Sequence, residues 1–436
     1  MDLKEKLISD YRLHESKLNG FARGKIYNIK LDAERYFELL GFPNRKQEDW
    51  RFTNVNPIIT NNYNYDLGAQ PQISEEDLQN FLVPGLKANT IVFINGIYSD
   101  KHSKIITEKG KAYIGTIKDT QKSNKELIEK YFAGNADYKT DGFTALNTAY
   151  MNDGVFIHVS KNTEIKEPVL ILNITDSSKG EIMYHPRVLL VAGESSKVSL
   201  IEIYESDGEN FSFSNAVTEI YSENNSEVHY YKIQNECDKS YHVGTTQVRQ
   251  ERDSRFNSLT VSWGGSVIRN NLNASLQNKG ADTIMKGLFI ASGNQQIDNH
   301  TLVDHASPYC HSNELYKGIM DENSNGVFNG KIMVRKDAQK TNAYQMNKNI
   351  ILSKSALVNS KPQLEIFADD VKCSHGATTG QLDNEQLFYL KARGIGEKEG
   401  KKLLLYAFAN EILEDIPIDD LKVYLEKKLS EKLEKK

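Results

Sequence analysis

Short runs of β-branched and aromatic residues recur along the middle of the chain, and polar corners separate them. Examples are TIVFINGIY, PVLILNI, PRVLLVAG, KVSLIEIY and EVHYYKIQ, each close to a cluster of Asn, Gly, Ser or Asp residues. Helical periodicity is nearly absent between residues 154 and 380. Strands this short at such regular spacing predict a sandwich, a barrel or a solenoid.

A weak internal repeat favours the solenoid. GESSKVSLIEI (193–203) superposes on ENNSEVHYYKI (223–233), and DSRFNSLTV (253–261) continues the series at nearly the same spacing. A second similarity joins ADTIMKGLFI (281–290) to NGVFNGKIM (325–333). Stacked units of this kind bury a continuous core that no single unit could bury. We therefore expect a mainly β protein with a parallel β-helix core, and a β-sandwich is the alternative.

Helical patterns flank this region. The sequence predicts an N-terminal helical region over 1–89, a β-strand region over 90–380 and a C-terminal helical domain over 381–436. Gly41 ends the first helical pattern, and Asp383 is placed to cap a later helix. Near the C-terminus, four leucines at i, i+4 spacing form a stripe that could dock either on the protein's own body or on a partner: Leu421, Leu425, Leu429 and Leu433.

Composition excludes several functional classes. The net charge of −5 lacks the basic footprint of a nucleic-acid-binding protein. The longest wholly apolar stretch, Leu403–Ala409, is far shorter than a membrane span, which argues against a membrane transporter subunit. The three scattered cysteines form no disulfide framework and the N-terminus has no signal-peptide pattern, so we expect a cytoplasmic protein. No GxxxxGK[ST] sequence occurs, so the chain is not itself a P-loop ATPase.

Cys373 and His375 form the first candidate metal site. A thiolate and an imidazole suit iron or copper, but two ligands cannot complete a four-coordinate shell. Considered alone, the spacing favours a structural interpretation, with a buried cysteine at the end of a strand and a histidine in a turn. A catalytic Cys–His pair is a third interpretation, which needs a proximity that the sequence does not show.

A second polar cluster contains five potential ligands. In an extended segment, His300 and His305 would point to opposite faces because they are five residues apart. One face could still collect His305 and His311 for a metal ion. Structural roles at the corners of a solenoid are nevertheless the favoured interpretation of the set, which consists of His300, Asp304, His305, Cys310 and His311.

Several segments together resemble one known family. They are QLEIFADDVKCSHGATTGQLDNEQLFYLKARGI (363–395), GGSVIRNNLNASL (264–276), DHASPYCHSNELYKGIMDENSNGVFNGKIMV (304–334), RKQEDWRFTNVNPI (45–58) and FINGIYS (93–99). This set resembles the SufB/SufD family of iron–sulfur cluster assembly proteins. Of the two branches, CSHGAT resembles the SufD type. No cysteine lies between Cys310 and Cys373, where SufB-type chains carry a scaffold cysteine.

The resemblance implies a right-handed parallel β-helix with helical flanks, acting as a non-catalytic scaffold subunit. It implies a complex with a SufB-like paralogue and a SufC-like ABC ATPase, in which the C-terminal helical domain binds the ATPase. A nascent cluster would form at the SufB–SufD interface, and a homodimer is possible when the paralogue is absent. The family's functional histidine falls on His375 and its neighbouring cysteine on Cys373, so both are expected to hold iron or a cluster transiently. The residues do not decide whether a flavin binds.

Two physical arguments bear on this expectation. Durable iron–sulfur clusters usually take four thiolates, so a half-shell shared with a partner would suit a scaffold that must release its product. The alternative is a carbohydrate-active β-helix enzyme that uses acidic residues on one solenoid face, with Glu365, Asp369 and Asp370 as candidates.

Overall fold

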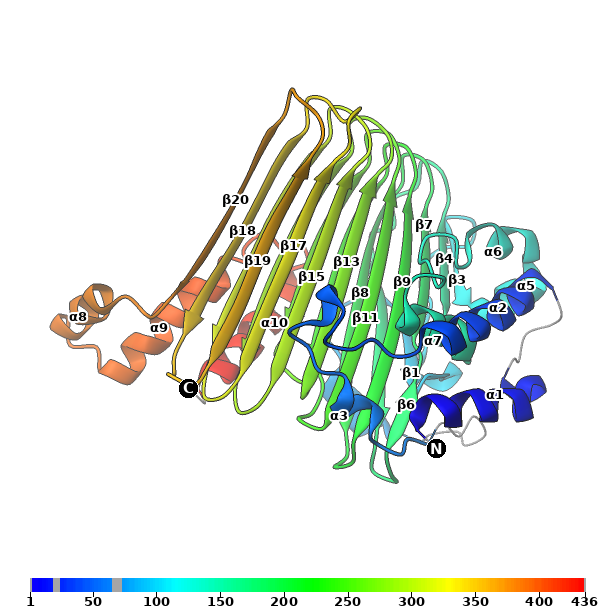
Figure 1. Cartoon of the computed structure of the whole chain (residues 1–436), viewed down its shortest axis with the longest axis horizontal. Helices are drawn as coiled ribbons and strands as arrows, with labels where there is room; N and C mark the ends of the chain where they lie inside the picture. Colours follow the sequence, from blue (N-terminus) through cyan, green and yellow to red (C-terminus); the bar gives the residue numbers. More distant parts are fainter. Residues whose placement is uncertain (1, 19–23, 65–72, 435–436) are drawn as a thin grey trace.

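The computed structural model describes residues 2–18, 24–64 and 73–434, and in these ranges it is a parallel β-solenoid with helices on both flanks (Figure 1). Two large sheets face each other, and the chain alternates between them as it winds along the long axis. The predicted parallel β-helix is thus confirmed.

Within each sheet, neighbouring strands of the solenoid are parallel. Among the described strands, the antiparallel pairs are β1 with β2 and β3 with β4. The first sheet has the order β2-β1-β5-β8-β10-β12-β14-β16-β18-β20. Its strands are β1 (Asn89–Ile94), β2 (Ile97–Tyr98), β5 (Val169–Asp176), β8 (Lys197–Asp207), β10 (Glu227–Asn235), β12 (Arg255–Ser262), β14 (Asp282–Ala291), β16 (His311–Met320), β18 (Asn342–Ile351) and β20 (Lys372–Gly380).

The second sheet has the order β19-β17-β15-β13-β11-β9-β7-β4-β3, and β6 also pairs with β9. Its strands are β3 (Ala112–Thr116), β4 (Val155–Val159), β6 (Ile182–Tyr184), β7 (Arg187–Ala192), β9 (Ser212–Ser222), β11 (Ser240–Gln250), β13 (Val267–Leu276), β15 (Gln296–His305), β17 (Asn325–Val334) and β19 (Leu357–Ile366).

The register explains the first sequence repeat. Val198 on β8 pairs with Val228 on β10, and Val228 pairs with Phe256 on β12, so the repeated positions stack in the core between the sheets. The prediction that the second pair of similar segments forms a repeat is wrong. Residues 281–290 lie on β14 in the first sheet, whereas residues 325–333 lie on β17 in the second. Both segments alternate in the same way because each turn of the solenoid contributes one strand to each sheet.

The N-terminal helices cover the outer face of the second sheet, except α4 (Glu75–Phe81), whose Leu78 packs in the apolar cluster on the first sheet. Leu7 and Phe37 pack in one apolar cluster with Phe143 and with Phe213 and Tyr241 of β9 and β11. Gly41 ends the second helix with a φ of 61°, as predicted. The helices are α1 (Leu3–Leu18), α2 (Lys25–Leu40), α3 (Asn56–Ile59), α4 (Glu75–Phe81), α5 (Ile117–Ser123), α6 (Lys125–Tyr131) and α7 (Gly142–Tyr150), with short 3-10 turns at Glu48–Trp50 and Asp100–His102.

The C-terminal helices are α8 (Asn384–Ala392), α9 (Glu397–Asn410) and α10 (Asp419–Glu434), and α9 and α10 cover the outer face of the first sheet. Asp383 caps α8 through the backbone amides of Glu385 and Gln386, as predicted. The leucine stripe of α10 is buried in a cluster with Ile233 and Trp263, so it docks on the protein's own body. None of the helices in the described ranges combines the length and hydropathy that crossing a bilayer requires.

Candidate functional site

Cys373 and His375 lie on β20, the last strand of the first sheet. β20 pairs with β18 on one side and has no strand on the other among the described residues (Figure 1). In the register, Cys373 lies beside Ala343 and His375 beside Gln345. Because side chains two residues apart on a strand point to the same face, the two candidate ligands share a face.

That shared face is the inner face of the solenoid. Ala343 and Gln345 are buried, and Cys373 packs against the apolar cluster that contains Ile332 and Ala343. His375 is nevertheless exposed, because no described strand continues the sheet beyond β20. The imidazole therefore lies over the last interior layer, at the open end of the solenoid.

Burial raises the pKa of the Cys373 thiol above its ordinary value. A nucleophilic cysteine requires a lowered pKa, so the burial of Cys373 does not favour a catalytic Cys–His pair. A metal ion that binds here has to displace the thiol proton, whereas a neutral imidazole is already a ligand. His375 is accordingly the more accessible donor of the two.

The site supplies few donors. In the described part of the chain, no three His, Cys, Asp or Glu side chains are arranged to hold a metal ion. The donor set at the open end is thus Cys373 and His375, which fits half of a coordination shell and cannot close a tetrahedral site.

Three residues of the second polar cluster make contacts within the fold. His305 is buried on β15, where its Nε2 lies 2.9 Å from Ser312 Oγ, and burial lowers its pKa to about 4. Cys310 is buried and its Sγ lies 3.3 Å from the carbonyl oxygen of Asn278. His300 pairs with Asp298 at 3.1 Å on the outer side of the second sheet.

The sequence analysis missed an ionic cluster that joins the N-terminal segment to the second sheet. Arg269 pairs with the fully buried Asp298 at 2.6 Å and lies over the ring of Trp50. Burial opposes ionisation of Asp298, but Arg269 and His300 hold its pKa well below its usual range. The signal was present in the aromatic residues of segment 45–58 and in the arginine after the double glycine. Their proximity is a property of the tertiary fold.

A buried column beneath His375 was also missed. Glu314 on β16 lies beside Gln345 on β18, and Gln345 lies beside His375 on β20. Gln345 Nε2 donates a hydrogen bond to Glu314 Oε2, and both side chains are almost completely buried. Burial raises the pKa of Glu314 to about 7. Sequence analysis normally assigns a polar residue on an alternating strand to the outer face, and Glu314 and Gln345 were missed for this reason.

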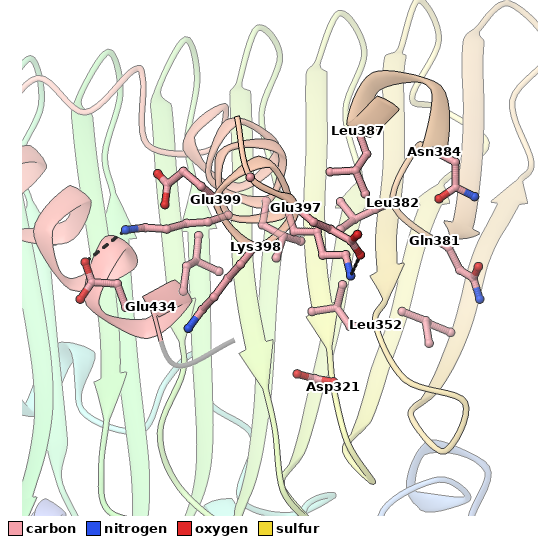
Figure 2. A pocket seen from close by; sticks show the side chains of 16 residues that line it. Asp321, Leu352, Gln381, Leu382, Asn384, Leu387, Glu397, Lys398, Glu399 and Glu434 are labelled. Carbon is pink, nitrogen blue, oxygen red and sulfur yellow. Dashed lines mark hydrogen bonds and ion pairs between the residues drawn. The ribbon is translucent and has the colours of Figure 1, made fainter. Parts of the chain in front are cut away.

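A separate groove of about 860 Å³ lies between the C-terminal helices and the edge of the first sheet (Figure 2). Its wall is apolar where Leu382, Leu387 and Leu405 line it, and charged residues of α9 surround it. Beside it, α8 extends past the end of the solenoid (Figure 1) and leaves Phe388 and Tyr389 72% and 58% exposed.

Comparison with protein-family models places these features in context. The model for the SufBD core domain of the SUF iron–sulfur cluster assembly system matches residues 173–408, which run from the middle of β5 through the rest of the solenoid and α8 to near the end of α9. The chain belongs to the SufBD family. The model for the SufBD N-terminal region matches residues 1–171. Membership gives the protein a role in iron–sulfur cluster assembly.

Individual relatives are similar in sequence to this chain along most of their lengths. An iron–sulfur cluster assembly SufBD family protein of Synechocystis is 32% identical over 418 residues, which are 93% of this chain and 91% of the relative. The iron–sulfur cluster assembly protein SufD of Escherichia coli is 29% identical over 90% of each chain. SufD of Bacillus subtilis is 28% identical over 91% of this chain and 92% of the relative.

Two of the three acidic residues of the carbohydrate-enzyme alternative form surface ion pairs. Glu365 lies 2.6 Å from Lys331 Nζ, and Asp370 pairs with Lys340. Asp369 is exposed to solvent. This arrangement is that of a solvated surface, and family membership favours the assembly role.

Proposed function

We propose that the protein is the SufD-type scaffold subunit of a SUF complex and that His375 contributes a ligand to a nascent iron–sulfur cluster. The observation that carries the proposal is the position of His375 on the inner face of the unpaired edge strand β20. A second solenoid that abuts this end would place its own donors opposite the imidazole. Cys373 is the second candidate ligand, and the iron is cargo that the site must release.

The open end has the surface character of a docking site. The last strands, β19 and β20, leave one edge each without a strand partner among the described residues, and such edges readily accept another chain. Large exposed apolar side chains gather on β18 and around β19: Tyr344, Met346, Leu357, Ile366 and Phe367. These features support a SufB-like paralogue as the partner, with a second copy of this chain taking its place when the paralogue is absent.

The C-terminal helices support a second partner. Leu387 is the buried residue of α8, while Phe388 and Tyr389 face solvent on the helix that extends away from the solenoid (Figure 1). Burying exposed aromatic side chains is the usual source of interface energy. We assign this surface to a SufC-like ABC ATPase, whose hydrolysis cycle would open and close the shared site. In this assignment the chain itself is a non-catalytic subunit.

The test is cluster formation in the purified three-component complex under anaerobic iron and sulfide supply. His375→Ala should leave the complex assembled and abolish the cluster absorption and Mössbauer signals. The matched control is Ser374→Ala, because Ser374 is an exposed neighbour on the same strand that points to the opposite face. Normal cluster yield in His375→Ala would overturn the proposal.

A further inference from the structure

The interior column under His375 contains a polar atom with no partner. Gln345 is 2% exposed, and its Nε2 donates to Glu314, but its Oε1 has no hydrogen-bond partner in the structure. A buried amide oxygen without a donor is unfavourable, because it has given up its hydrogen bonds to water. An uncompensated cost of this kind points to a donor that is held nearby or arrives in another state.

Several contacts restrain the amide of Gln345 so that its oxygen and nitrogen are not interchangeable. When Glu314 is ionised, both of its oxygens are acceptors only, so the nitrogen of the amide has to face it. Across the interior, Gly330 of β17 leaves the space that the amide fills, since a Cβ at Gly330 would lie 2.4 Å from Gln345 Nε2. With Nε2 committed toward Glu314, Oε1 is the free end of the amide.

His375 is a neighbour that can supply the missing donor. It lies on β20, which is next to β18 in the first sheet. In the parallel register His375 lies beside Gln345, on the same face of the sheet. A neutral imidazole carries one N–H donor and one lone pair, on different nitrogens. If the N–H is donated to Gln345, the lone pair is left on the other nitrogen.

We propose that Gln345 is a positioning residue for His375: its orphan side-chain oxygen accepts the imidazole N–H and selects the tautomer whose other nitrogen is free to bind iron at the open end. Glu314 supports this arrangement by orienting the amide. The inference rests on the ligand role of His375 proposed above. Histidines that bind metals are commonly held by a second hydrogen bond of this kind, and losing it typically weakens metal binding 10–100-fold.

The direct test reads the tautomer in the protein before any metal is added. In protein labelled with 15N-histidine, the His375 ring nitrogens are identified by comparison with His375→Ala, at a pH where the imidazole is neutral. We expect a single tautomer in the wild type and a mixture of both tautomers in Gln345→Leu. Gln234→Leu is the matched control, because Gln234 is another fully buried interior glutamine of the first sheet, far along the solenoid from β20.

A swap variant separates positioning from simple damage to the core. Glu314→Gln combined with Gln345→Glu keeps an amide–carboxylate hydrogen bond and an acceptor oxygen beside His375, so it should restore the single tautomer. Binding of Co²⁺ alone to the assembled complex, followed by absorption, should weaken 10–100-fold in Gln345→Leu and recover in the swap.

Identical ring-nitrogen shifts in the wild type and Gln345→Leu would overturn the inference, as would a swap variant that behaves like Gln345→Leu. These outcomes differ from failure of the proposed function. If His375→Ala forms clusters normally, the ligand role fails whatever the tautomer is. If His375→Ala forms none and Gln345→Leu leaves the tautomer unchanged, only the positioning role fails.

Discussion

Glu314 should make the protein less stable as the pH rises, and replacing it should remove that dependence. The side chain is 1% exposed inside the solenoid, and it accepts a hydrogen bond from Gln345. Burial raises its pKa from an ordinary 4.5 to about 7. The folded protein therefore holds the Glu314 proton over a pH range in which the unfolded chain has released it.

The sign and size follow from proton linkage. Between about pH 4.5 and pH 7 the native state binds more protons at this site, so the free energy of unfolding falls as the pH rises and levels off above pH 7. With the two pKa values above, the cost is about 1 kcal/mol at pH 5 and about 3 kcal/mol at pH 8. Glu314→Gln has no proton to lose, so its stability relative to the wild type should increase by about 2 kcal/mol between these two pH values.

Urea unfolding of both proteins at pH 5, 6, 7 and 8 measures this double difference, in which all other titrating groups cancel. Hydrogen exchange of peptides from β16 and β18 should show the same trend locally, because each turn of a solenoid contacts only its neighbours. Glu314→Asp is the control, since it keeps a titrating carboxylate in the same column. A stability difference between Glu314→Gln and the wild type that does not change with pH would refute the reasoning.

Two further substitutions test what holds the flanking helices and the first turns. Leu425→Ala on α10 removes a fully buried side chain, so it should lower the free energy of unfolding by about 2–5 kcal/mol and expose α10 to protease. Val423→Ala on the exposed face of the same helix should change the free energy of unfolding by less than about 0.5 kcal/mol. Equal protease resistance of the two variants would contradict the docked position of α10. Arg187→Met should cost about 3–5 kcal/mol because it leaves Glu219 buried without its ion-pair partner, and adding Glu219→Gln should recover part of the loss in thermal or urea unfolding. No loss in the single variant would show that the pair contributes little.

Much of the local structure could be predicted because its causes lie within a few residues. The capping of α8 by Asp383 and the glycine at the end of α2 are short-range geometry, and both are as the sequence indicates. The repeat around Val198 and Val228 was readable because the corners between these strands have nearly equal lengths. The second similarity, between β14 and β17, was misassigned because two strands on different sheets of one solenoid obey the same alternation.

The sequence by itself determined the solenoid class and the helical flanks, and it singled out His375 and Cys373 as candidate ligands, because a period-2 pattern with regular polar corners and a local CSHGAT motif are properties of consecutive residues. Only the tertiary structure decided that the leucine stripe of α10 packs on the first sheet, that β20 is an open edge, and that His375 faces inward above Gln345 and Glu314. Residues that lie side by side in a solenoid are one whole turn apart in the chain. Their contact depends on the register between strands, which follows from the packing of all the turns together and not from any single segment.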